Sequence, residues 1–204
     1  MVVLGITGGI GAGKGLATEF FRTRGAVIID ADQVSRELTG PGSPLVAQIA
    51  SALGAEYVRP DGSLDRARLG RRVFGDRAAL AKLNEIMHPP ILAEVERRIE
   101  AARRAGAQVV CVVAPLLLEA GGRGLVDRLL VVTAQEEERV RRVRERDGLS
   151  EAEVRERMAA QMLTGEQRRQ ADWVVDTTES REAARRQLEQ VWAELKRSRP
   201  RPKS

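Results

Sequence analysis

The residues best equipped for chemistry are those of the glycine-rich segment Gly8-Gly-Ile-Gly-Ala-Gly-Lys14. The segment lies between an apolar run at residues 2–6 and an amphipathic pattern that starts at Gly15. Between a strand and a helix, such glycines let backbone N–H groups converge on a polyphosphate, and the helix adds its positive N-terminal end. Lys14 would then reach the β- and γ-phosphates as a point charge. We interpret the segment as a phosphate-binding loop rather than as a glycine-rich turn without a ligand.

One part of this motif is missing. Phosphate loops usually continue after the lysine with Ser or Thr, whose hydroxyl binds Mg²⁺, whereas this chain continues with Gly15 and Leu16. The change affects the expected metal site more than the expected phosphate site, because the loop glycines and Lys14 are all present.

Two carboxylates form a second candidate site. Asp30 and Asp32 follow a short apolar run at residues 27–29, which is typical of a parallel strand buried on both faces. Parallel strands end at a common edge of the sheet, so we expect both carboxylates near the phosphate loop as acid–base candidates. The alternative is that both are N-cap residues of a helix over residues 34–38. We favour a division in which one caps the helix and the other faces the γ-phosphate, where it could share in holding Mg²⁺.

Five apolar strand signals alternate with helical patterns. They lie at residues 2–6, 27–29, 109–113, 129–132 and 173–175 and predict an α/β fold of three layers, a five-stranded parallel sheet flanked by helices. Residues 40–106 show helical patterns throughout, which indicates an insertion. We expect one domain over residues 1–196, with a core at 1–39, 107–134 and 171–196, a helical insertion at 40–106, a helical lid at 135–170 and a disordered basic tail at 197–204.

Local signals mark several helix ends. The segment His88-Pro89-Pro90 predicts a break between two helices of the insertion. His88 is the only histidine, and its spacing favours a helix-end residue bonded to a backbone carbonyl over a substrate contact. Thr133 with Glu136, and Ser150 with Glu153, have the spacing of capping boxes.

The helix expected after residue 135 is rich in arginine, which stabilises the spreading charge of a transferring phosphoryl group. Most of these arginines are better explained as a solvated face paired with glutamates, and one or two are expected to point inward. The residues concerned are Arg139, Arg141, Arg142, Arg144 and Arg146.

Composition narrows the class of function. The formal net charge of +5 comes from Lys196, Arg197, Arg199, Arg201 and Lys203, since the remainder carries 29 basic and 29 acidic residues. A formally neutral body with 3% aromatic residues argues against nucleic-acid binding.

Cys111 lies in an apolar run and is expected to be a buried, reduced thiol, and the longest apolar stretch is too short to cross a bilayer. We expect a cytoplasmic protein without a membrane or nucleic-acid partner, as a monomer or weak homo-oligomer.

Taken together, the motifs resemble those of the dephospho-CoA kinase family over residues 2–192. The resemblance is carried by the phosphate loop, Asp30-Ala-Asp32 with Arg36, His88-Pro89, Pro115-Leu-Leu-Leu-Glu119, Arg142, Arg146-Asp147, Gln161 and Ala171-Asp172. Many nucleotide kinases share the loop, whereas the other segments in this order are specific to this family.

The resemblance implies transfer of the γ-phosphoryl group of ATP, with Mg²⁺, to the ribose 3′-hydroxyl of dephospho-CoA. It implies catalytic roles for Lys14, Arg142 and Asp32, the last as base and as a possible metal ligand. The implied nucleotide-binding residues are Gly9, Gly11, Ala12, Gly13, Lys14, Gly15, Leu16, Arg142, Arg146 and Thr177, and the implied acceptor-binding residues are Asp32, Arg36, His88, Pro115, Leu116, Leu117, Glu119 and Gln161.

Two positions depart from the family pattern. Gly15 replaces a Ser or Thr, and Thr177 stands where the family usually has Asn near the adenine. The alternatives to this function are another small-molecule or nucleotide kinase on the same scaffold, a nucleotide-binding regulator without catalysis, and a nucleic-acid binder that uses the basic tail.

Overall fold

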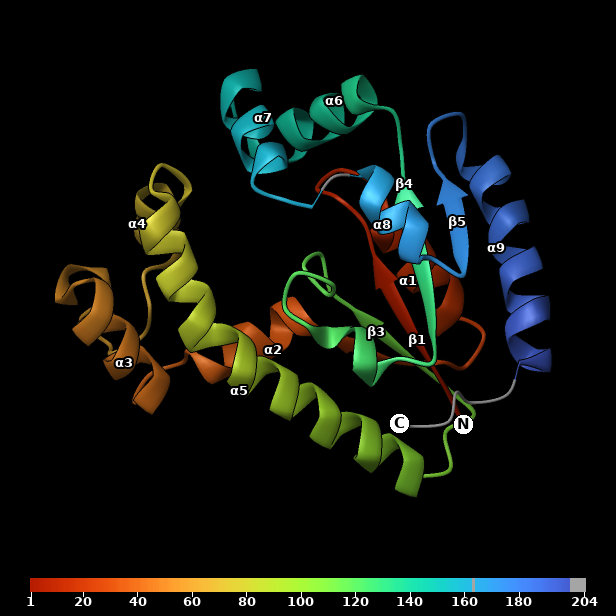
Figure 1. Cartoon of the computed structure of the whole chain (residues 1–204), viewed down its shortest axis with the longest axis horizontal. Coiled ribbons are helices and arrows are strands. Elements are labelled where there is room, and N and C mark those ends of the chain that lie inside the picture. Colours follow the sequence, from red (N-terminus) through yellow and green to blue (C-terminus); the bar gives the residue numbers. More distant parts are fainter. Residues whose placement is uncertain (163, 199–204) are drawn as a thin grey trace. The chain divides into compact units, whose positions relative to one another are not determined.

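The computed structural model describes residues 1–162 and 164–198 and contains a parallel sheet with the strand order β2-β3-β1-β4-β5 (Figure 1). The strands are β1 (Val2–Thr7), β2 (Val27–Asp30), β3 (Val109–Val113), β4 (Arg128–Thr133) and β5 (Trp173–Asp176). All pairings between them are parallel. The five predicted strands and the predicted parallel sheet are confirmed.

Helices α1 (Lys14–Arg22) and α9 (Arg181–Arg197) share one apolar core with the sheet. Buried residues of α9 recur at helical spacing, with Leu188 and Leu195 fully enclosed beside Leu4 and Phe21. The rings of Phe21 and Trp192 lie 6.0 Å apart between the two helices. Three further helices, α6 (Glu136–Asp147), α7 (Glu151–Ala159) and α8 (Thr164–Gln170), lie between β4 and β5 along the chain.

Two aspartates fix the amino ends of the strands. Asp127 Oδ2 accepts a hydrogen bond from the Val3 amide at 2.7 Å, and Asp172 Oδ2 accepts one from the Leu129 amide at 2.8 Å. Asp172, which belongs to one of the family-like segments, therefore has a structural contact at the edge opposite the phosphate loop. The carboxyl ends of the strands remain for chemistry, as is usual in parallel sheets.

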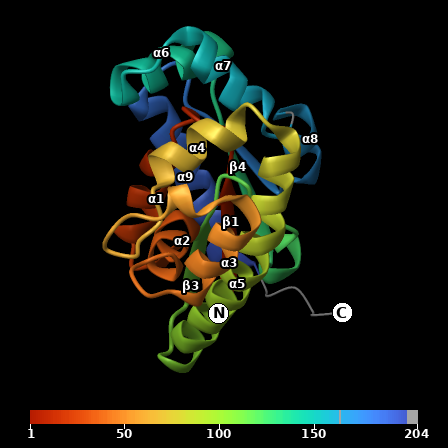
Figure 2. The ribbon, with the colours of Figure 1, turned by 90° about the vertical axis from the view of Figure 1, so that its left-hand side faces the viewer.

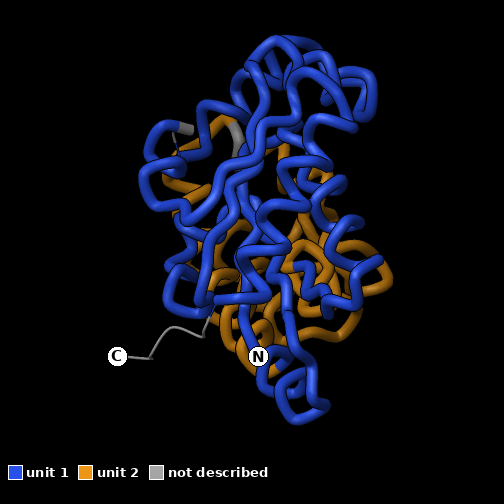
Figure 3. Tube along the Cα trace, turned by 90° about the vertical axis from the view of Figure 1, so that its right-hand side faces the viewer, with its two compact units in different colours: residues 1–30, 98–204 blue, residues 31–97 orange. Residues whose placement is uncertain are grey.

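The chain groups into two compact units (Figure 3). Unit 1 comprises residues 1–30 and 98–204 and contains the whole sheet, and unit 2 comprises residues 31–97. Unit 2 contains α2 (Ala31–Leu38), α3 (Pro44–Leu53), α4 (Arg66–Phe74) and most of α5 (Arg77–Arg104) (Figure 2). Its own core includes Ile49, Tyr57 and Leu69. The insertion, lid and domain limits expected from the sequence stay predictions.

The predicted helix break at His88-Pro89-Pro90 is wrong. Helix α5 runs without interruption through both prolines for 28 residues, and His88 lies inside it rather than at an end. A proline inside a helix removes one hydrogen bond and costs about 3 kcal/mol. Met87 before the prolines and Val95 after them are both buried, so packing on both sides holds the helix together.

One of the two predicted capping boxes is also wrong. Thr133 is the last residue of β4, and α6 begins after Gln135, whose side chain makes no cap. The Gln135 amide instead donates to Thr178 Oγ1 at 2.9 Å, so a residue after β5 supplies the acceptor. The second box, Ser150 with Glu153 at the start of α7, is confirmed. Arg197 ends α9, and residues 199–204 of the predicted disordered tail lie outside the described residues.

Candidate active site

The predicted phosphate loop connects β1 to α1. Gly8 and Gly13 have φ values of 141° and 89°, in a region that favours glycine. At Gly8 a Cβ atom would also lie 2.1 Å from the carbonyl oxygen of Val132, so the loop leaves β1 pressed against β4. The nucleotide-binding residues expected between Gly9 and Leu16 all lie on this loop or in the first turn of α1.

Lys14 is folded back over the loop. Its Nζ donates to the carbonyl oxygen of Gly8 at 2.7 Å and to that of Gly9 at 3.2 Å. The first turn of α1 contains no acidic residue, and its amides carry the partial positive charge of the helix N-terminus. An ammonium group and the positive end of a helix therefore meet at one place, which suits a polyphosphate.

The tip of the loop is held by two side chains from distant parts of unit 1. The Ile10 amide donates to Gln161 Oε1 at 2.8 Å, and Arg139 Nε donates to the Ile10 carbonyl oxygen at 2.9 Å. Arg139 is only 8% exposed, and burial lowers the pKa of its guanidinium, an effect that Glu136 opposes. A Cβ atom at Gly9 would lie 2.1 Å from Arg139 Nη2, so this glycine is needed for the guanidinium to fit.

These contacts were not among those expected from the sequence. Gln161, implied as an acceptor-binding residue, is bonded to the phosphate loop. Arg139 is one of five arginines in α6, and no sequence motif distinguishes it from the others. A signal was present, because Arg139 lies four residues before the buried Val143 and therefore shares its side of α6.

We expect the Arg139→Met variant to bind ATP about tenfold more weakly, with little change in kcat at saturating ATP. A hydrogen bond from a charged donor contributes about 1.5–3 kcal/mol, and without it the Ile10 carbonyl can turn toward the phosphates and repel them. Calorimetric titration with ATP measures the change. Arg144→Met, at an exposed position of the same helix, is the matched control. An unchanged Kd for ATP in the Arg139 variant would show that the contact serves stability alone.

A pocket of about 550 Å³ opens beside the loop. Gly13, Leu16, Arg142 and Thr177 contribute to its wall, together with residues 178–181 from the start of α9 and the turn before it. Its position next to the phosphate site is that expected for the nucleoside part of ATP.

Arg142 joins the two sides of this pocket. Its Nη2 donates to the Thr177 carbonyl oxygen at 2.6 Å, its Nη1 to Thr177 Oγ1 at 2.8 Å, and its Nε to Glu138 Oε1 at 2.8 Å. Hydrogen bonds from Arg141 first and Arg142 next lower the pKa of Glu138 to about 2. The Thr177 hydroxyl donates in turn to the Ala12 carbonyl oxygen at 2.9 Å. Thr177 thus ties β5 to the phosphate loop, and its hydroxyl is already bonded on both sides.

The family model for dephospho-CoA kinase matches residues 2–182. The chain belongs to the dephospho-CoA kinase family. Dephospho-CoA kinases of Syntrophotalea carbinolica and Moorella thermoacetica are 43% and 42% identical, covering 96% and 97% of this chain and 92% and 93% of their own. The chain is accordingly a phosphotransferase of coenzyme A biosynthesis.

Solved structures agree on the fold. A crystal structure from Thermus thermophilus has a TM-score of 0.77 at 37% identity and covers 95% of this chain and 97% of its own. Dephospho-CoA kinase from Campylobacter jejuni has a TM-score of 0.70 at 23% identity, covering 96% and 97%. Shikimate kinase from Acinetobacter baumannii, at a TM-score of 0.54 and 12% identity over 96% and 93%, shows the fold alone. The sheet and phosphate loop are therefore those of a P-loop kinase.

In this kinase the segment Pro115-Leu-Leu-Leu-Glu119 lies close to the loop contacts. Thr7 Oγ1 donates to the Pro115 carbonyl oxygen at 3.2 Å, and Glu119 Oε1 accepts from the Met162 amide at 2.9 Å. Glu119 Oε2 is buried and has no hydrogen-bond partner among the described residues. Leu117 is buried against Gly5, so its side chain serves the core. Leu116 is half-buried.

The other predicted site residues belong to different elements of the chain. Arg146 is bonded to Asp147 at 2.7 Å and does not line the pocket beside the loop. Asp30 ends β2 in unit 1, while Asp32 and Arg36 are exposed residues of α2 in unit 2 and His88 is half-buried in α5.

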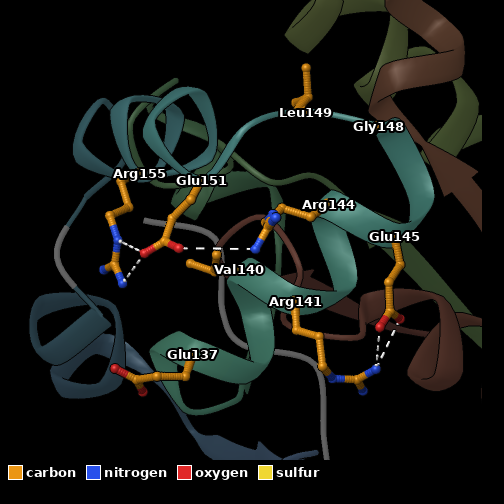
Figure 4. Close-up of a pocket in the computed structure, with 9 residues that line it drawn as sticks. All are labelled: Glu137, Val140, Arg141, Arg144, Glu145, Gly148, Leu149, Glu151 and Arg155. Atoms are coloured by element: carbon orange, nitrogen blue, oxygen red, sulfur yellow. Dashed lines mark hydrogen bonds and ion pairs between the residues drawn. The ribbon is translucent and has the colours of Figure 1, made fainter.

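The arginines of α6 fall into two groups, as expected. Figure 4 shows a second pocket, of about 600 Å³, along α6 and the start of α7, where arginines are paired with glutamates. Arg141 Nη1 lies 2.7 Å from Glu145 Oε1, and Arg144 lies 4.0 Å from Glu151. Arg139 and Arg142 instead point to the phosphate loop and its pocket, which confirms that one or two arginines turn inward.

Residues 1–162 and 164–198 contain no group of three or more His, Cys, Asp or Glu side chains that could hold a metal ion. None of the helices described is long and apolar enough to cross a membrane.

Proposed function

We propose that this kinase transfers the γ-phosphoryl group of ATP to the ribose 3′-hydroxyl of dephospho-CoA, giving CoA and ADP. The observation that carries the proposal is the phosphate loop with Lys14 over it and an open pocket at its side, in a chain of this family. Another small-molecule or nucleotide kinase, or a regulator without catalysis, is not favoured by the family assignment.

Each proposed role follows from the chemistry of the residue. Lys14 and the loop amides hold the phosphates, and Arg142 adds positive charge where negative charge develops on the transferring group. Asp32 removes the proton from the 3′-hydroxyl as it attacks. Closure of residues 135–170 over ATP would exclude water, which otherwise competes as the phosphoryl acceptor.

The expected Mg²⁺ site is where this phosphate loop differs most from others. Gly15 offers no hydroxyl, and the hydroxyl of Thr18 is bonded to the Lys14 carbonyl oxygen at 2.9 Å. A Cβ atom at Gly15 would meet nothing within 4 Å, so there is room for a water molecule at this position. Mg²⁺ usually keeps several waters and binds one or two carboxylates and the substrate phosphates. These residues fit the ion if water replaces the hydroxyl, with Asp32 as the candidate protein ligand. When bound, Mg²⁺ would neutralise the phosphate oxygens.

The Gly15→Ser variant is expected to need less Mg²⁺ for half-maximal rate and for half-maximal ATP binding. The added side chain fits without displacing a neighbour and restores a hydroxyl ligand. Displacement of a fluorescent ATP analogue at increasing Mg²⁺ gives the binding curve independently of turnover. Gly15→Ala, which adds the Cβ atom without the hydroxyl, is the control. Identical Mg²⁺ curves for the serine and native proteins would mean that water or Asp32 already fills the role.

An ADP-release assay tests the acceptor directly. Purified protein with ATP and Mg²⁺ is given dephospho-CoA, AMP, CMP or shikimate in separate reactions, and phosphorus NMR locates the new phosphate. Turnover with dephospho-CoA and a new 3′-phosphomonoester is expected. Turnover with another acceptor alone would overturn the proposal.

We also propose a cytoplasmic location, without a membrane or nucleic-acid partner, and a monomer or weak homo-oligomer. Cys111 is fully buried in β3, and burial raises the pKa of its thiol to about 12, so it stays an unreactive thiol in the folded protein. Fractionation and light scattering would test these statements.

A further inference from the structure

Unit 2 carries an exposed group of charged side chains around Arg66. Arg66, the first residue of α4, is fixed to α2 through its Nη2 atom. That atom donates to the Ser35 carbonyl oxygen at 2.7 Å, to Ser35 Oγ at 3.2 Å and to Thr39 Oγ1. An arginine at a solvent-exposed position is therefore held in one place by three contacts.

The face of α2 that Arg66 contacts also carries Asp32 and Arg36. Residues three or four apart share a side of a helix, and Asp32, Ser35, Arg36 and Thr39 follow this spacing. Burial and then the positive charge of Arg36 lower the pKa of Arg66, whereas the carboxylate of Asp32 raises it. The three charged residues thus form one cluster with two cations and one acid.

The two cations of this cluster have donors available for a ligand. Among the described residues, none accepts a hydrogen bond from Nε or Nη1 of Arg66, and none forms an ion pair with Arg36. Other arginines of α4 are satisfied: Arg72 pairs with Asp76 at 2.6 Å, and Arg68 donates to the Glu56 carbonyl oxygen at 2.9 Å. Two neighbouring guanidinium groups repel each other, and an anion with several oxygens that binds both removes the repulsion.

We propose that Arg36 and Arg66 form a diphosphate-binding subsite of unit 2, which takes the diphosphate of dephospho-CoA. The planar guanidinium group matches pairs of phosphate oxygens. The 3′-hydroxyl belongs to the ribose that carries this diphosphate, so Asp32 on the same face of α2 is placed for that hydroxyl. Arg66 is then an acceptor-contacting residue that the sequence motifs did not reveal. The inference rests on dephospho-CoA being the acceptor.

The test is the affinity for dephospho-CoA, measured by calorimetry on the whole protein. Arg66→Met is expected to weaken dephospho-CoA binding by about tenfold or more, as for the loss of a hydrogen bond to a charged group, and to leave the Kd of ATP unchanged. Arg72→Met removes the same charge from an exposed pair on the same helix and should change neither affinity. Adenosine, which lacks the diphosphate, should bind the native protein and the Arg66 variant equally well.

Two further measurements separate ligand binding from a purely structural role. Thr39→Val removes one anchor of Arg66 but keeps both positive charges, so dephospho-CoA binding should fall far less than in Arg66→Met. The salt dependence of dephospho-CoA binding should become weaker in Arg66→Met, because one charge contact is lost. If the methionine variant does not fold, Arg66→Lys can be used instead. It keeps the positive charge but lacks the planar guanidinium group, so it should weaken dephospho-CoA binding to an intermediate degree.

Three results would overturn the subsite. They are a Kd for dephospho-CoA within twofold of the native value in a folded Arg66 variant, equal losses in Thr39→Val and Arg66→Met, or a loss of ATP affinity instead. Failure of the proposed reaction has a different signature, because the native protein itself would then not phosphorylate dephospho-CoA in the ADP-release assay.

Discussion

Replacing Lys14 by methionine is expected to lower kcat/KM for ATP by about 10² to 10³, the range observed when one preorganised donor is removed from a charge-stabilising site. The ammonium group already lies against the loop, bonded to the Gly8 and Gly9 carbonyl oxygens, so it meets the phosphates without rearrangement of the chain. Single-turnover measurements with ATP and dephospho-CoA would give the change in the chemical step, and equilibrium binding would give the change in ATP affinity.

Lys14→Arg is the matched control because it keeps the charge in a larger group. We expect it to retain part of the activity and the native fold. A methionine variant with near-native kcat/KM would show that the loop amides suffice and that Lys14 only closes the loop through its two carbonyl contacts.

The Asp32→Asn variant is expected to have a kcat lower by about 10² or more, the lower end of the range for general acid–base catalysis, with native ATP binding. The amide keeps the size of the side chain but cannot accept the proton of the 3′-hydroxyl. Steady-state rates with dephospho-CoA as the varied substrate measure kcat, and ATP titration of the same variant shows whether binding is intact.

Asp30 provides the internal comparison for this experiment. It is two residues away in the sequence and ends β2, whereas Asp32 belongs to the first turn of α2. Asp30→Asn should leave kcat within a few-fold of the native value. A large loss in Asp30→Asn together with a near-native Asp32→Asn would reverse the two assignments.

Sequence patterns predicted the features that depend on residues close together in the chain. Buried parallel strands have continuous apolar runs, so the five strands were visible, and a loop whose glycines adopt positive φ values shows itself by those glycines. The end of a strand is less distinct. The hydroxyl of Thr133 suits a helix cap, but its backbone continues the pairing of β4 with β5.

Other features depend on contacts that no local pattern contains. Helix α5 continues through Pro89-Pro90 because residues on both sides are buried. The bond from Arg139 to Ile10 joins positions 129 residues apart, and that from Ile10 to Gln161 joins positions 151 apart. The family resemblance pointed to Gln161, and no motif singled out Arg139, since their contacts form only when the phosphate loop meets the turn after α7 and helix α6.

The burial of Cys111 makes the chain its own reporter of unfolding. It is the single cysteine of the sequence and lies inside β3, paired with Leu4 on one side and Ile28 on the other. A thiol reagent reaches it only after the central strands separate, so the alkylation rate follows the population of opened molecules. Ligands that bind the folded state suppress that population. Mass spectrometry of labelled protein can therefore rank the nucleotide and acceptor affinities of every variant without a coupled enzyme or an added fluorophore.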